Sequence, residues 1–68
     1  MKVVVNGEVT EFSEQATVVN VLEQLGRGAQ PRGVAVAVNG EVVPKGEWRA
    51  TALHDDDRIE VLNAVGGG

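Results

Sequence analysis

Two Asn-Gly pairs, each beside a run of β-prone residues, constrain the fold of this chain more than any other feature of its sequence. Asn-Gly is the preferred pair for a two-residue type I′ turn, because both central positions of that turn need a positive φ angle. The first pair, Asn6-Gly7, lies between KVVV and EVTEF and predicts a hairpin over residues 2–12. The second pair, Asn39-Gly40, follows VAVAV and predicts a strand over residues 34–38 with a short partner that ends at Pro44.

The segment between the two predicted hairpins has the period of an amphipathic helix. Thr17 is a suitable N-cap for this helix and Gly26 a suitable stop. The β-branched valines at its start lower the helix propensity, but the period and the caps outweigh them. The following GRGAQPRG, residues 26–33, has the composition of a flexible loop. The residues on the apolar helical face are Val18, Val21, Leu22 and Leu25.

The C-terminal part predicts one more strand. Residues 45–57 are expected to form an irregular or single-turn connection, and RIEVLNAV, residues 58–65, a strand. Because side chains alternate between the faces of a strand, Ile59 and Val61 are expected to point inward and Leu62 outward.

The order of these elements indicates an α+β domain. Hairpin, helix, strand, short strand, crossover and final strand predict a mixed sheet of four to five strands around one helix. The strand over 34–38 alternates Val with Ala, so both its faces are apolar and both are expected to be covered. We expect a domain over residues 1–63 and a flexible tail over residues 64–68, which would reach roughly 17 Å when extended.

Composition excludes several classes of function. The chain has 68 residues and no cysteine, so it holds no disulfide or thiolate metal ligand, and any sulfur chemistry must use sulfur supplied from outside. A formal charge of -4 argues against nucleic-acid binding, which depends on Lys and Arg. Residues 1–20 show no basic leader with an apolar run, and no stretch approaches the roughly 20 apolar residues that span a bilayer. We therefore expect a cytoplasmic protein with no nucleic-acid or membrane partner.

The chain ends in NAVGGG, and consecutive glycines suit a terminus that must enter a narrow active site. A terminal carboxylate is a poor acceptor for nucleophiles, but once joined to AMP as an acyl-adenylate it accepts sulfur or nitrogen. Gly68 is therefore a candidate adenylation site, and Gly66 and Gly67 are the tail residues that lead to it. A frayed terminus or a cloning remnant explains the same residues, and on the tail alone both interpretations stay open.

Four parts of the sequence together resemble one family. They are the VNG of the first hairpin, a VP followed by a basic residue and Trp48, the DDRIEV of the last strand, and the terminal Gly-Gly. Across essentially its whole length the chain is similar to the ThiS family of sulfur carriers in thiamine biosynthesis. It departs from the family at Gly66, where a larger residue is frequent, and at Asp56, where glycine is common.

The resemblance implies a β-grasp fold, like that of ubiquitin, and a function. An ATP-dependent, E1-like adenylyltransferase activates the carboxylate of Gly68. A sulfur-donating enzyme then converts it to a thiocarboxylate, and thiazole synthase draws the sulfur into the thiazole ring. The resemblance implies that the carrier is not an enzyme and binds no cofactor, since ATP is used by the adenylating partner.

The adenylating partner must also hold the body of the carrier. Arg58, Glu60 and Leu62 alternate with the inward Ile59 and Val61, so they are predicted to form a partner interface on the outer sheet face.

Two other features allow either a structural or a functional interpretation. His54 and the three aspartates after it fit a solvated turn better than a metal site, because neighbouring positions do not converge on one ion without special loop geometry. Trp48 either anchors a partner or covers the edge of the core.

Three alternative functions share the expected fold. A carrier for molybdenum cofactor synthesis has the same Gly-Gly tail, but the length and the VPKGEW segment favour thiamine. A ubiquitin-like modifier would join Gly68 to lysines of target proteins. A non-catalytic β-grasp binding module would not need the tail at all.

Overall fold

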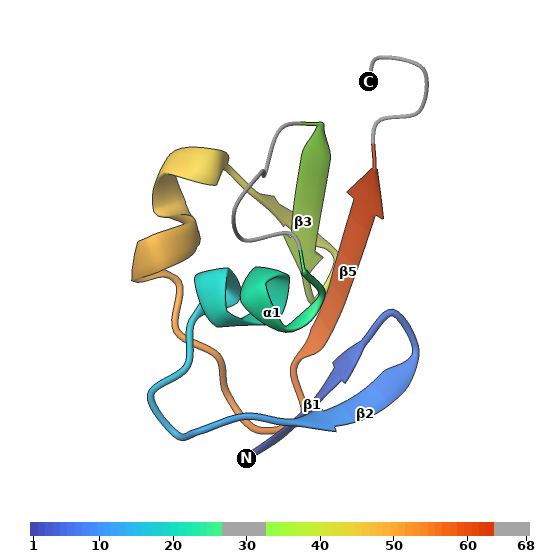
Figure 1. Ribbon diagram of the computed structural model, residues 1–68, viewed down its shortest axis with the longest axis vertical. Helices are drawn as coiled ribbons and strands as arrows, with labels where there is room; N and C mark the ends of the chain where they lie inside the picture. Colours follow the sequence, from blue (N-terminus) through green and yellow to red (C-terminus); the bar gives the residue numbers. More distant parts are fainter. Residues whose placement is uncertain (27–32, 64–68) are drawn as a thin grey trace.

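The computed structural model describes residues 1–26 and 33–63. They form a five-stranded sheet, one α-helix and one 3₁₀ helix (Figure 1). The strands are β1 (Lys2–Val5), β2 (Glu8–Glu11), β3 (Val34–Val38), β4 (Glu41–Val43) and β5 (Arg58–Asn63), and the helices are α1 (Val18–Gln24) and η1 (Lys45–Ala50). The predicted mixed sheet around one α-helix is confirmed.

The C-terminal strand lies in the middle of the sheet. The strand order is β2-β1-β5-β3-β4, and β5 runs parallel to β1 and antiparallel to β3. Both predicted hairpins are present, each with a positive φ at its two turn residues: 49° and 85° at Asn6-Gly7, and 51° and 85° at Asn39-Gly40. These angles explain the choice of Asn-Gly at both turns. Pro44 follows the last residue of the edge strand β4, as predicted.

Helix α1 begins and ends where its caps predict. The backbone N–H of Thr17 donates a 2.7 Å hydrogen bond to Oδ1 of Asn20, and Gly26 has a φ of 76° just after the helix. Leu25 is 42% exposed, so its predicted place on the buried face is wrong. The helix ends at Gln24, and Leu25 at the C-cap has left the helical period. The three buried residues of the helix are Val18, Val21 and Leu22.

The core lies between the two helices and one face of the sheet, with α1 crossing that face (Figure 1). Val3 and Val5 of β1, Val36 of β3 and Ile59 of β5 supply the sheet side. The connection before β5 was predicted to be irregular or a single turn, whereas η1 extends over six residues. Trp48 of η1 is buried, and its Nε1–H donates a 2.9 Å bond to the carbonyl of Val43, which assigns this residue to the core.

The opposite face of the sheet is not covered by any element among the described residues. Ala35 is exposed and Ala37 half-buried, so the prediction that β3 is covered on both faces is wrong. The reason is that both helices pack on the same side of the sheet. The predicted loop lies mostly in residues 27–32, outside the described residues, as does the tail, residues 64–68. The division into domain and tail therefore stays a prediction.

Candidate functional site

The three predicted interface residues lie on the uncovered face of the sheet. Arg58, Glu60 and Leu62 are exposed, while Ile59 is buried and Val61 half-buried on the core side. The predicted alternation of β5 is thus confirmed, and it brings the three side chains to one face of the central strand. Their contact with a partner stays a prediction.

Strand register places small and apolar residues around these three. Val4 lies opposite both Arg58 and Val9, Ala37 lies opposite Glu60 and Val42, and Ala35 lies opposite Leu62. Exposed fractions of 69% at Val9, 74% at Val42 and 65% at Leu62 leave much apolar surface in water. We call this surface the open face; it consists of Val4, Val9, Ala35, Ala37, Val42, Arg58, Glu60 and Leu62. A cluster of exposed apolar side chains on one face of a sheet has the character of a protein interaction site.

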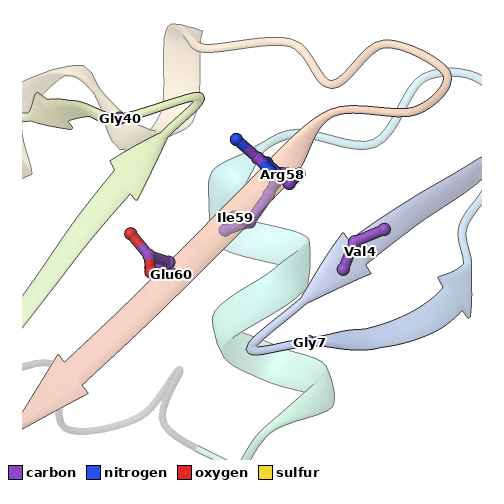
Figure 2. Close-up of a pocket in the computed structure, with 6 residues that line it drawn as sticks. All are labelled: Val4, Gly7, Gly40, Arg58, Ile59 and Glu60. Carbon is purple, nitrogen blue, oxygen red and sulfur yellow. The ribbon is translucent and has the colours of Figure 1, made fainter.

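A shallow depression of about 320 Å³ lies along the start of β5. Figure 2 shows that its lining includes one glycine from each hairpin turn, Gly7 and Gly40, on either side of β5. Val4, Arg58, Ile59 and Glu60 complete it. The depression therefore belongs to the open face. Its cation, Arg58, and its anion, Glu60, occupy successive outward positions of β5.

Side chains from both hairpin turns bind the backbone of β5. Oδ1 of Asn6 accepts a 2.8 Å bond from the N–H of Val61, and its Nδ2 donates a 3.3 Å bond to the carbonyl of the same residue. Oδ1 of Asn39 accepts a 2.9 Å bond from the N–H of Arg58. Sequence reasoning missed these contacts. Asparagine at the first position of both turns was visible, but turn geometry alone explains that choice.

Carboxylates of the acidic turn before β5 accept hydrogen bonds from other parts of the fold. Asp57 is buried and accepts bonds from the N–H of His54 (2.7 Å) and from Nδ2 of Asn39 (3.0 Å). Asp55 accepts a 2.8 Å bond from the N–H of Lys2. Within residues 1–26 and 33–63, no three His, Cys, Asp or Glu side chains gather as they would around a metal ion. The turn therefore anchors the start of β5 to its neighbours.

The candidate adenylation site lies outside the described residues. Gly66, Gly67 and Gly68 belong to the five residues that follow β5, whose last residue is Asn63. The central strand of the sheet is therefore the element from which the chain continues to its glycines.

A mixed five-stranded sheet that holds one α-helix, with the C-terminal strand at its centre, defines a protein of the β-grasp, ubiquitin-like class. The model of the ThiS family matches residues 3–68. The crystal structure of the thiamine biosynthesis protein ThiS from Geobacter metallireducens is similar over the whole of both chains, with a TM-score of 0.81 and 36% identity. The chain belongs to the ThiS family.

Two curated relatives differ in length. The sulfur carrier protein ThiS of Escherichia coli is 29% identical over 68 residues, which cover all of both chains. A thiazole synthase of Paramagnetospirillum magneticum is 43% identical over the whole of this chain. The chain spans only 20% of that relative's length, so the similarity concerns a part of a larger protein. None of the helices that the structure describes is long and apolar enough to cross a membrane.

Proposed function

We propose that this protein is the sulfur carrier for thiazole formation in thiamine biosynthesis, and that the carboxylate of Gly68 carries the sulfur. The match to the ThiS family carries this proposal, because it extends over residues 3–68 and so includes the terminal glycines. The similarity to the E. coli sulfur carrier over all of its length supports the same conclusion.

The chemistry takes place at the terminal carboxylate. One oxygen of Gly68 attacks the α-phosphorus of ATP, and pyrophosphate leaves. A sulfur nucleophile from the donor enzyme then attacks the acyl carbon, and AMP leaves with that oxygen. If the nucleophile is a persulfide, a thiol must reduce the resulting acyl disulfide, which releases the thiocarboxylate. Partners supply catalysis and bind the ATP, and the carrier is a substrate throughout.

The open face is the part of the carrier that the adenylyltransferase would hold. Its apolar residues gain free energy when they leave water, and the charges of Arg58 and Glu60 favour a partner with opposite charges in register. Because β5 supplies the central residues of this face and the chain continues from β5 to Gly68, docking and delivery of the carboxylate share one strand.

Thiazole synthase is the proposed acceptor of the sulfur. The resemblance of this chain to a part of two proteins named thiazole synthase supports this assignment, because a carrier joined to an enzyme would deliver its cargo there. A sulfur-donating enzyme completes the set of partners, and the proposed setting of these reactions is the cytoplasm.

Intact mass spectrometry tests the proposal. The purified chain is incubated with ATP, an adenylyltransferase that is active on its own carrier, a sulfur donor and a thiol reductant. A mass gain equal to the replacement of one oxygen by sulfur is expected. A chain that lacks Gly67 and Gly68 is the matched control and should stay unchanged. No gain in the full chain would contradict the proposal.

A further inference from the structure

The strand β5 is held at two points by asparagines in equivalent positions of the two hairpin turns. Asn39 bonds to the backbone of Arg58, the first residue of the strand, and Asn6 bonds to the backbone of Val61, further toward the C-terminus. Figure 2 shows the glycines of both turns, Gly7 and Gly40, flanking this strand. The same residue type thus performs the same task on either side of β5.

Asn6 extends the pairing of β1 and β5 beyond the end of β1. The backbone ladder contains bonds of 2.9 Å from Val4 N–H to the carbonyl of Asp57 and from Asn6 N–H to the carbonyl of Ile59. The chain then turns away at Gly7, and the side-chain amide of Asn6 takes the place of the next backbone partner. It offers Val61 an acceptor at 2.8 Å and a donor at 3.3 Å, as a strand would.

The turn itself does not require this side chain. A φ of 49° at Asn6 is open to glycine, which adopts positive φ angles without a steric penalty. The role of Asn6 in the turn can therefore be separated from its role toward Val61 by substitution.

We propose that Asn6 is a positioning residue of the carrier, which fixes the root of the tail by holding Val61 in the sheet. This inference rests on the proposed function. Leu62 and Asn63 pair with β3 on one edge of this strand end, and Asn6 holds the other edge at Val61. With both edges held, the direction in which β5 leads toward Gly68 is defined. Loss of the clamp leaves this end of β5 paired with β3 alone, which widens the range of directions in which the strand end can point and lowers the effective concentration of the carboxylate in the partner's active site.

The contacts of Asn6 with Val61 are exposed, so water can replace them and the fold should survive their loss. The expected change is local fraying of the strand end near Val61, with the core intact. Asn39→Gly is a matched control, because it removes the one side-chain bond from this turn to Arg58 and also a bond to the buried Asp57.

The test measures ATP–pyrophosphate exchange by an adenylyltransferase with the full-length chain and its variants. At saturating carrier, Asn6→Gly should lower kcat by roughly threefold or more, while Asn39→Gly leaves kcat unchanged although it is less stable. Asn6→Asp retains an acceptor for Val61 N–H and should restore part of the rate. Amide exchange at Val61 should be roughly fivefold faster in Asn6→Gly but not in Asn39→Gly.

The outcomes separate the two proposals. If the unaltered chain supports no exchange, the proposed function fails, and this inference falls with it. If the unaltered chain is active and Asn6→Gly has the same kcat, the positioning role is overturned. Equal losses of kcat in Asn6→Gly and Asn39→Gly would also overturn it, because lower stability of the fold would then explain both losses.

Discussion

The side-chain amide of Asn39 donates a 3.0 Å hydrogen bond to the carboxylate of Asp57. The same carboxylate accepts a 2.7 Å bond from the backbone N–H of His54 and is only 8% exposed. Asp57 therefore joins the turn between β3 and β4 to the turn that precedes β5. Because water has little access to this carboxylate, both donors depend on it for their hydrogen bonds.

Replacement of Asp57 should destabilise the whole fold. Asp57→Ala leaves the donors of His54 and Asn39 without their acceptor, and we expect a loss of about 2 kcal/mol in the free energy of unfolding. Urea titration measures this loss. Asp55→Ala is the control, because that carboxylate also accepts a backbone N–H but is exposed, so its loss should be smaller. Equal losses would show that burial of Asp57 is irrelevant.

Asp56 has a φ of 70°, in the left-handed region that favours glycine. Glycine would adopt this angle without the strain of a Cβ atom. Asp56→Ala should be less stable than Asp56→Gly by about 1 kcal/mol, because the alanine Cβ is strained at this φ. Thermal unfolding of both variants measures the difference. Asp56→Asn is the control for the lost charge and should resemble the unaltered chain; an alanine variant as stable as the glycine variant would contradict the explanation.

Local turn chemistry made most of the fold predictable. Asn6-Gly7 and Asn39-Gly40 specify their hairpins through φ angles that few other residue pairs adopt, and Gly26 ends α1 for a related reason. Coverage of β3 could not be predicted, because Ala35 suits a buried face as well as an exposed one. Whether the second face of β3 is covered depends on the packing of distant elements, and no pattern within β3 carries it.

Trp48 is the only tryptophan of the chain and reports on the edge of the core. Its indole N–H donates to the carbonyl of Val43, so Trp48→Phe should lose this bond while it retains most of the apolar contact. We expect a loss of about 1 kcal/mol for Trp48→Phe and about 3 kcal/mol or more for Trp48→Ala. Urea unfolding followed by circular dichroism measures both.

Fluorescence provides an independent check on Trp48. Emission of the native chain should be blue-shifted and should move to the red on unfolding, because the indole passes from the core to water. Native emission typical of exposed tryptophan would contradict its place in the core.

The candidate site was predictable only in part. Period-two alternation along β5 places Arg58, Glu60 and Leu62 on one face, and the structure confirms this placement. The apolar surroundings at Val9 and Val42 depend on register with strands far away in sequence, so they emerged only from the sheet pairing. The clamp between Asn6 and Val61 joins residues 55 positions apart and is likewise invisible to local patterns.

Charge reversal on the open face should weaken docking without loss of the fold. Arg58→Glu and Glu60→Lys change exposed side chains, so the unfolding transition should barely move. Each substitution places a side chain opposite a partner charge of the same sign, so it should raise the Kd for the adenylyltransferase by roughly tenfold. Calorimetric titration measures the affinity. Glu47→Lys on η1 is the matched control, because this exposed residue lies outside the open face. An unchanged Kd for the two β5 variants, or an equal rise for Glu47→Lys, would remove the open face from the interface.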